Sequence, residues 1–312
     1  MVPATRHGDR CPVRRAGRGF GHHSQVDAWL DDRLARADGC EDPDELIDLG
    51  CDLADAGRLG DAELCFRRAA ALGSATAEFD LGNTLKDQQR LAEAAAAYER
   101  AIAGGETDAW LNLGQVLEEL ADEDGAMRAY AGAAKSGDSN GALSLAFMLR
   151  ERGDNAAASE RAKAAAASGN ALAAAVVASW DWDETLDPTL EAALRAGADL
   201  YPSARANLAE LLRSTDRAAE ARAVLEVGAK RGEVEIWLPL GNLYVDELGD
   251  VEAAEQAYRT GIAAGDAHCH LNLGLLLAAR GDKDGATEQF RLGAAAGDES
   301  AARMLRAEPP PS

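Results

Sequence analysis

The sequence has few aromatic residues, fewer basic than acidic residues, and no long apolar run. Aromatic residues make up 5% of the chain, and 32 Lys and Arg stand against 54 Asp and Glu, for a net charge of −22. Such an acidic excess repels nucleic-acid phosphates and anionic lipids, so it argues against both as partners and favours a neutral or basic partner. Because no stretch of about 18 apolar residues occurs, we expect no membrane-spanning helix.

The sequence also lacks a recognisable catalytic or metal-binding pattern. Its five cysteines show no zinc-site or redox spacing. His268 and His270 flank Cys269, but helix residues two apart point to different sides and cannot hold one metal. Arg14-Arg15 is followed by no apolar core of a signal peptide. We therefore predict no enzyme activity, no cofactor and no metal, and a cytoplasmic location.

One dipeptide recurs along the chain at a nearly fixed interval. Leu-Gly, or a close substitute, returns every 31 to 33 residues. This period is typical of a solenoid, whose units bury their apolar faces by stacking on their neighbours. The second residue of each dipeptide is taken as offset 0 of its repeat. The eight dipeptides are Leu49-Gly50, Leu81-Gly82, Leu113-Gly114, Leu145-Ala146, Val177-Ala178, Leu208-Ala209, Leu240-Gly241 and Leu273-Gly274.

Each repeat is predicted to contain two helices. In the first helix, the apolar offsets −4, −1, 0 and +3 share one face. In the second helix a small residue is followed four positions later by an aromatic one, except in repeats four to six, which lack the aromatic residue and which we expect to bend or loosen. Aspartates near the start of the second helices are predicted N-caps. The residues at the aromatic position are Phe66, Tyr98, Tyr130, Ala162, Leu194, Leu225, Tyr258 and Phe290, and the predicted caps are Asp61, Asp154, Asp250 and Asp282.

The order of these positions resembles the tetratricopeptide repeat family. Trp110 and Trp237 occupy the tryptophan position of that repeat, and Ala69, Ala101 and Ala133 its closing alanine. The Ala-rich ends that close on Gly-Asp also resemble Sel-one-like repeats. The resemblance implies an all-α fold, a right-handed α-α superhelical solenoid of about eight helix hairpins, and a non-catalytic role in protein binding.

The predicted organisation has four parts. Residues 1–24 are rich in Gly and Arg and are expected to form a disordered basic tail. Residues 25–42 should form an N-terminal capping helix, and residues 299–312 a short C-terminal capping helix with a Pro-rich end. Residues 43–300 hold the eight repeats, at about 43–74, 75–106, 107–138, 139–170, 171–201, 202–233, 234–266 and 267–298.

The first helices carry a polar stripe opposite their apolar face, at offsets −2, +1 and +5. In the tetratricopeptide family this stripe faces the concave groove, so the resemblance implies a partner-binding groove. Carboxamides there can bond the backbone of an extended peptide, and carboxylates favour Lys or Arg. The predicted groove residues are Asp48, Asp80, Asn83, Asp87, Asn112, Gln115, Glu119, Glu151, Trp182, Asn207, Asn242 and Asn272.

The fifth repeat departs from the pattern because Asp181 stands at an apolar offset. Either the first helix ends early, before Asp187-Pro188, or Trp182 turns into the core position. Trp182 is also a candidate anchor for a partner, because tryptophan is frequent at binding hot spots.

The leading hypothesis is an adaptor or scaffold that binds a neutral to basic protein or peptide. It would be a monomer or a weak homo-oligomer. The alternatives are a peptide-sensing regulatory protein that changes pitch at repeats four to six, and a homo-oligomeric assembly module. A further alternative is that the basic tail docks on the acidic body of its own or another chain.

Overall fold

The computed structural model describes residues 23–307, which form eighteen α-helices and no strand. The predicted all-α solenoid of helix hairpins is therefore confirmed. The chain divides into two compact units, within the helix that spans residues 155–167. Unit 1 ends at residue 165 and unit 2 begins at residue 166.

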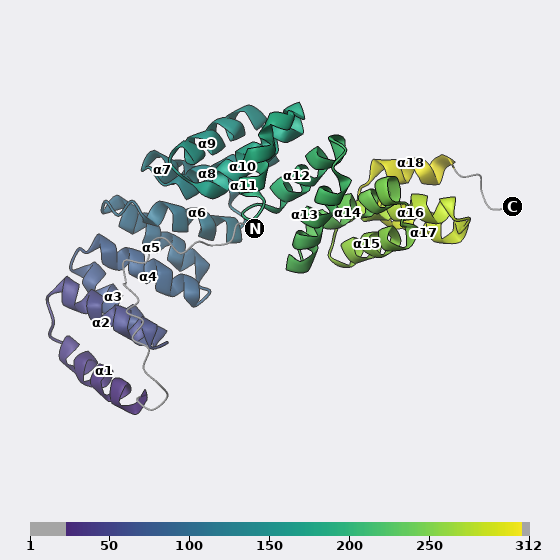
Figure 1. The fold of residues 1–312 in the computed structure, drawn as a ribbon. Coiled ribbons are helices and arrows are strands. Elements are labelled where there is room, and N and C mark those ends of the chain that lie inside the picture. The colour runs from purple at the N-terminus through teal and green to yellow at the C-terminus, as the bar shows by residue number, and fades with distance from the viewer. Residues whose placement is uncertain (1–22, 308–312) are drawn as a thin grey trace. The chain divides into compact units, whose positions relative to one another are not determined.

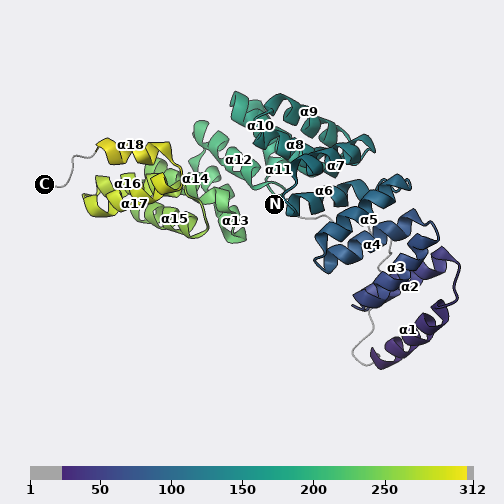
Figure 2. The ribbon, with the colours of Figure 1, turned by 180° about the vertical axis from the view of Figure 1, so that it is seen from behind.

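Unit 1 is a stack of helix hairpins in which, from α1 to α8, each helix packs on the next along the chain (Figure 1). The same order is visible from behind (Figure 2). The first helices of repeats one to four are α2, α4, α6 and α8, and the second helices are α3, α5, α7 and α9. The elements are α1 (His23–Ala37), α2 (Pro43–Asp55), α3 (Leu59–Ala71), α4 (Ala75–Asp87), α5 (Leu91–Ala103), α6 (Ala109–Glu119), α7 (Glu123–Lys135), α8 (Ser139–Glu151) and α9 (Asn155–Ala167).

Unit 2 continues the hairpins but with less regular helices. Its first helices are α10, α12, α14 and α16, and its second helices are α11, α13, α15 and α17. The elements are α10 (Ala171–Thr185), the 3₁₀ helix η1 (Pro188–Leu190), α11 (Glu191–Gly197), α12 (Pro202–Ser214), α13 (Ala218–Arg231), the 3₁₀ helix η2 (Val234–Ile236), α14 (Trp237–Leu243), the π-helix η3 (Tyr244–Leu248), α15 (Val251–Ala263), α16 (Cys269–Ala279), α17 (Lys283–Ala295) and α18 (Glu299–Ala307).

The glycine at offset 0 is required by the aromatic ring of the second helix. In the five repeats with this glycine, a Cβ atom there would lie 2.3 to 2.6 Å from a ring carbon. In repeats four to six, alanine stands at offset 0 and the opposing residue is Ala162, Leu194 or Leu225, all fully buried. In repeats five and six a larger residue at offset 0 is therefore matched by a smaller one opposite, so the sizes are exchanged in pairs, whereas repeat four has alanine at both positions. The five pairs are Gly50 with Phe66, Gly82 with Tyr98, Gly114 with Tyr130, Gly241 with Tyr258 and Gly274 with Phe290.

The predicted aspartate caps are correct for three of the four helices. The carboxylates of Asp154, Asp250 and Asp282 accept hydrogen bonds from backbone N–H groups in the first turns of α9, α15 and α17. The prediction for Asp61 is wrong, because this residue lies inside α3 and pairs with Arg58.

An irregular helix accompanies the longest interval between dipeptides. In repeat seven, 33 residues separate Leu240 from Leu273, and the first helix changes from α to π geometry at Tyr244. A π segment accommodates one extra residue without breaking the helix. The insertion is thus absorbed locally.

Helices stand at both ends of the described residues. Helix α1 begins at His23, two residues before the predicted start, and buries Leu30. At the other end, α18 buries Ala301. The predicted tail, except for its last two residues, and the Pro-rich end lie outside the described residues.

Candidate functional site on the first helices

Two of the predicted carboxamides, Asn83 of α4 and Asn112 of α6, are hydrogen-bonded to each other. The amide nitrogen of Asn112 donates to Asn83 Oδ1 at 2.9 Å, and the hydroxyl of Tyr98 on α5 donates to the same oxygen at 2.8 Å. Tyr98 is fully buried, and this burial raises the pKa of its hydroxyl. The hydroxyl therefore remains a donor at neutral pH and fixes the orientation of Asn83.

This arrangement leaves one hydrogen-bond donor and one acceptor of the two asparagines unused. Asn83 Oδ1 already accepts two hydrogen bonds, whereas its amide nitrogen makes none with the described residues. The carbonyl oxygen of Asn112 likewise makes none there. Both side chains are half-buried. A donor on α4 and an acceptor on α6 are thus available to a ligand that carries both, such as a peptide backbone.

Unit 2 contains the same arrangement between its repeats seven and eight. Asn272 donates to Asn242 Oδ1 at 2.6 Å, and the Tyr258 hydroxyl donates to that oxygen at 2.7 Å. Burial raises the pKa of Tyr258 to about 12, so its hydroxyl also stays a donor. We call each set of two asparagines and one tyrosine an Asn-Asn-Tyr rung.

Asn207 forms a different contact from the same position. Its amide nitrogen donates to the backbone oxygen of Ser179 at 3.1 Å and to Asp183 Oδ1 at 2.8 Å. These bonds connect α12 to α10 within unit 2. Because its donor is engaged in this way, Asn207 offers less to a ligand than Asn112 does.

Gln115 is engaged within unit 1. Its carbonyl oxygen accepts a hydrogen bond from Lys86 Nζ at 2.8 Å. The neighbouring tyrosine, Tyr130, donates to the carboxylate of Glu118 rather than to a carboxamide. Repeat three therefore has no third Asn-Asn-Tyr rung.

The carboxylates at offset +5 of unit 1 are exposed and form no ion pair with the described residues. Asp48, at offset −2 of α2, is likewise exposed and forms no ion pair with the described residues. Together these five side chains line one stripe of the first helices, and we call this stripe, with the rung of α4 and α6, the first-helix face of unit 1. The five carboxylates are Asp48, Asp55, Asp87, Glu119 and Glu151.

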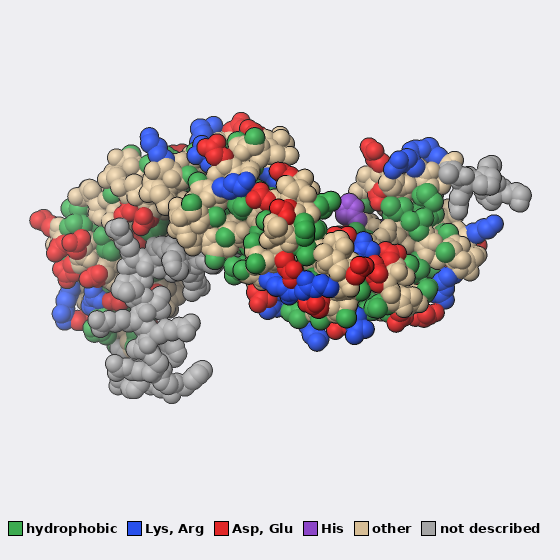
Figure 3. Space-filling model, turned by 45° about the horizontal axis from the view of Figure 1, so that its top comes forward, with side chains coloured by type: hydrophobic (Ala, Val, Ile, Leu, Met, Phe, Trp, Pro, Cys, Tyr) green, Lys and Arg blue, Asp and Glu red, His purple; other side chains and the backbone are tan. Residues whose placement is uncertain are grey.

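In unit 2 the corresponding carboxylates have partners. Asp246 pairs with Arg213 at 3.4 Å, and Glu210 pairs with the same guanidinium at 3.0 Å. Asp183 accepts the hydrogen bond from Asn207. Figure 3 also shows Lys and Arg side chains lying among Asp and Glu on the visible surface of this unit. The predicted acidic stripe is therefore uncompensated in unit 1 and compensated in unit 2.

Asp80 differs from the other acidic residues of the face. It is half-buried, and burial, together with repulsion from Glu106, raises its pKa to about 7. At neutral pH this carboxyl is therefore divided between the protonated and the ionised form. It therefore carries only part of a negative charge at this pH.

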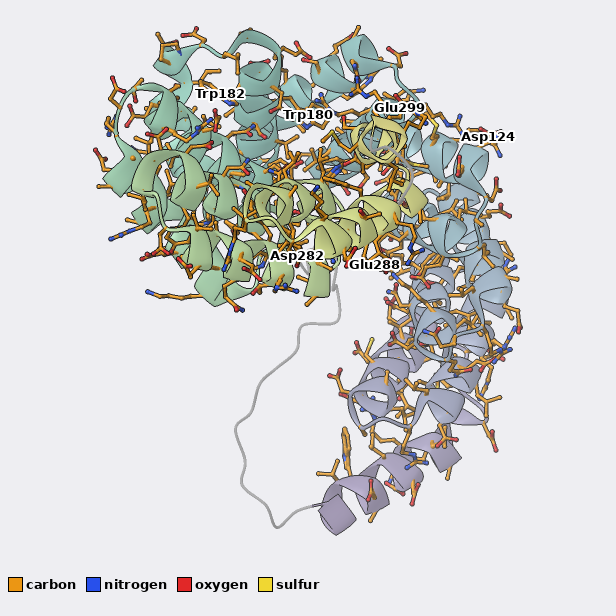
Figure 4. The ribbon with its side chains drawn as sticks, turned by 90° about the vertical axis from the view of Figure 1, so that its right-hand side faces the viewer. Asp124, Trp180, Trp182, Asp282, Glu288 and Glu299 are labelled. Carbon is orange, nitrogen blue, oxygen red and sulfur yellow. The ribbon has the colours of Figure 1, made fainter. Side chains whose placement is uncertain are left out.

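The structure corrects the prediction for Trp182. Helix α10 continues to Thr185 rather than ending early, and the Trp182 side chain is 4% exposed and packs with Leu194 and Ala198. Both Trp180 and Trp182 come from this helix (Figure 4). A side chain in the core of unit 2 has no surface to offer a partner, so the anchor hypothesis is wrong and the core position is filled by Trp182.

The described residues show no arrangement for metal binding. They contain no group of three or more His, Cys, Asp or Glu side chains that could hold an ion. His270 Nδ1 lies 2.8 Å from Gln289 Oε1. Cys40, Cys65 and Cys269 are free cysteines. No helix among residues 23–307 is both long and apolar enough to cross a bilayer.

Sequence reasoning missed the role of Tyr98 and Tyr258 at this site. Both were interpreted only as core aromatics. The available signal was the coincidence, in repeats two and seven, of a tyrosine in the second helix with asparagine at offset +1 and of asparagine at offset −2 in the following repeat.

Several solved structures share this fold. A protective antigen of uropathogenic Escherichia coli, c5321, which displays an SLR fold, is 20% identical, with 90% of this chain and 71% of that chain covered and a TM-score of 0.61. A Sel1 repeat protein from Oxalobacter formigenes is also 20% identical, with 89% and 90% covered and a TM-score of 0.61. A chain of the APC/C hetero-tetramer Cut9-Hcn1 is 14% identical, with 93% and 60% covered and a TM-score of 0.58. At these identities the likeness shows the fold alone.

No curated protein matches this sequence. The tetratricopeptide repeat, in contrast, matches residues 47–109, 79–141 and 239–302, which together make up just over half of the chain. Both Asn-Asn-Tyr rungs lie within these matched regions. The Sel-one-like features agree with the structural likeness to Sel1 repeat proteins. The chain belongs to the tetratricopeptide repeat family.

Proposed function

We propose that this chain is a non-catalytic scaffold that holds an extended, neutral to basic segment of a protein partner on its first helices. The tetratricopeptide repeat fold is a general scaffold for protein–protein interaction. The observation that carries the finer proposal is the Asn-Asn-Tyr rung, because a buried tyrosine orients two carboxamides and leaves one donor and one acceptor unused.

The rungs would bind a peptide through its backbone. The amide of Asn83 would donate to a peptide carbonyl, and the carbonyl oxygen of Asn112 would accept from a peptide N–H. Because every residue carries these backbone groups, the rung does not select a sequence. Asn242 and Asn272 would act in the same way in unit 2.

Charge selection would then come from unit 1. Asp87, Glu119 and Glu151 are exposed and lack ion pairs with the described residues. A Lys or Arg side chain of the partner would gain a charge-assisted hydrogen bond without displacing an internal partner. Unit 2 would bind with less preference for charge, because Asp246 and Asp183 are engaged.

The test is a selection of peptides from a random display library on the full-length protein, followed by fluorescence anisotropy with the selected peptides. We expect Asn112→Ala to weaken binding at least ten-fold for peptides bound to unit 1, and Asn272→Ala to do the same for unit 2. Asn155→Ala is the matched control, because Asn155 is exposed on the second helix α9.

Melting temperatures of all three variants separate loss of binding from loss of folding. If the selected peptides bind all variants equally, the proposal fails. If they bind only when Asn112 is present but show no excess of Lys or Arg, the backbone contact stands and the charge preference is wrong.

A further inference from the structure

The first-helix face of unit 1 carries five exposed carboxylates that have no ion-pair partner among the described residues. Like charges on neighbouring helices repel one another, so this face favours a cationic occupant. On unit 2, by contrast, Arg213 pairs with both Asp246 and Glu210.

We propose that the occupant in the free protein is the N-terminal segment of the same chain, residues 1–22. This inference rests on the proposed function, because the segment would cover the surface that we assign to the partner. The two proposals nevertheless fail separately, as the experiment below shows.

The composition of the segment matches the face in charge. Residues 1–22 contain five Arg and a single acidic residue, Asp9, and lie outside the described residues. Four of these arginines follow one another at intervals of four residues, so their guanidinium groups are spread along the segment. Arginine pairs with carboxylates through two parallel hydrogen bonds, which suits Asp and Glu side chains on successive helices. The arginines are Arg6, Arg10, Arg14, Arg15 and Arg18.

The segment is also long enough to cover the face. Packed helices lie about 10 Å apart, so the stripe from α2 to α8 spans on the order of 30 Å. A flexible chain of 22 residues has a root-mean-square length of about 26 Å and an extended length of about 70 Å. Since the segment joins the fold at α1, next to repeat one, its arginines can reach each of the four first helices.

The consequence is competition between the segment and a partner. A tethered segment has an effective concentration on the order of 1 mM at its own face. A weakly basic peptide would therefore be excluded, whereas a more basic partner, or one that also uses the rung of Asn83 and Asn112, would displace the segment. The segment would thus raise the affinity that a partner needs in order to bind to this face.

The experiment compares the wild-type chain with a full-length, tail-neutral variant in which all five arginines of the segment are changed to serine. The probe is a fluorescent synthetic peptide of residues 1–22, and its binding is followed by anisotropy. Cys11→Ser is introduced in both proteins and in the probe so that only noncovalent binding is measured. We expect the tail-neutral variant to bind the probe at least ten-fold more tightly than the wild type, because its own tail no longer competes.

Two further variants of the tail-neutral protein locate the binding surface. Neutralising the face with Asp87→Asn, Glu119→Gln and Glu151→Gln should weaken probe binding at least ten-fold. The matched control, Glu41→Gln, Glu99→Gln and Glu160→Gln, removes the same charge from exposed positions of unit 1 away from the face, and should change it less than two-fold.

Equal binding of the probe to the wild type and the tail-neutral variant would overturn the proposal, as would equal losses in the face and control variants. Oligomers of the wild type that disappear in the tail-neutral variant would assign the tail to a neighbouring copy and overturn the intramolecular contact. Peptides selected from the library test the proposed function independently. If these bind through Asn112 while the tail probe does not bind, only the present inference fails.

Discussion

The two units have the same hairpins but use them differently. In unit 1, exposed carboxylates at offset +5 of all four first helices lack an ion pair with the described residues. In unit 2, Asp246 pairs with Arg213, and Asp183 accepts a hydrogen bond from Asn207. Both units keep one Asn-Asn-Tyr rung. Under the proposed function, backbone recognition would be common to both units, and charge recognition would be confined to unit 1.

The two units also differ in the side chains that pack between the two helices of each hairpin. Each repeat of unit 1 except the fourth closes on a glycine and an aromatic ring. Repeats five and six of unit 2 close on alanine and leucine, and repeat five adds Trp182 to its core. In repeat five, Trp182 therefore supplies core volume that an aromatic ring of the second helix supplies elsewhere. The predictions below test both differences.

The largest effect is expected from Trp182→Ala. Removal of a buried tryptophan costs about 3–5 kcal/mol, through lost burial and the cavity that remains. We expect a lower midpoint of urea unfolding for unit 2, measured by circular dichroism, with peptide binding to unit 1 unchanged. The control is Trp29→Ala, because Trp29 is 50% exposed, and it should cost less than about 1 kcal/mol. Weaker peptide binding at unchanged stability would return Trp182 to the role of an anchor.

Much of the fold was predictable because each repeat carries the same local sequence signals. The interval of the Leu-Gly dipeptide gives the number of hairpins, and the apolar offsets give their buried faces, as Leu53 and Leu85 show. Aspartates such as Asp154 and Asp282 give the starts of second helices. These features are local, so one sequence is sufficient to find them.

The arrangement of the candidate site was harder to predict because it depends on contacts between repeats. Helix geometry places Asn83 and Asn112 on the polar stripe. Only the structure shows that Asn112 and Tyr98 both donate a hydrogen bond to the side-chain oxygen of Asn83. Likewise, the pairing of Asp246 with Arg213 joins residues 33 positions apart. The sequence pattern did not decide whether Trp182 is exposed or buried. A change of one position along a helix turns the side chain by about 100°, so a small error in register moves it from one face to the other.

The next largest effect is a pH dependence that unit 1 should have and unit 2 should lack. The pKa of Asp80 is raised to about 7 by burial and by Glu106, above its value in the unfolded chain. The folded state therefore binds the proton more tightly, and stability is lost as pH rises from about 4 to about 7. Asp80→Asn should remove this loss, with a gain on the order of 2–4 kcal/mol at pH 8 and little gain at pH 4.

Urea unfolding of the wild type and the variant at both pH values measures this difference. Asp87→Asn is the control, because Asp87 is exposed on the same helix. An equal gain at pH 4 and pH 8 would mean that Asp80 acts through packing and not through its charge.

A smaller effect tests the exchange of small and large residues within the hairpins. Gly50→Ala would place a methyl group 2.6 Å from the ring of Phe66, and overpacking of this kind costs about 1–3 kcal/mol. In the double variant with Phe66→Leu, the alanine should cost less than it does alone, because the pair then resembles Ala178 with Leu194 in unit 2. A double-mutant cycle of unfolding free energies measures the coupling, and additive effects would contradict the exchange.

The smallest effect concerns the turns between the two helices of a repeat. Gly153 and Gly281 adopt positive φ angles of 81° and 86° there, whereas in repeat three the same conformation falls on Ala121, with φ of 60°. A side chain in this region costs about 1 kcal/mol relative to glycine. Ala121→Gly should therefore stabilise unit 1 by about that amount, and Gly281→Ala should destabilise unit 2 by a similar amount. Thermal unfolding of both variants checks the two signs together. If Ala121→Gly lowers stability, the added freedom of the unfolded chain outweighs the relief of strain, and this turn of unit 1 tolerates its alanine better than its backbone angle implies.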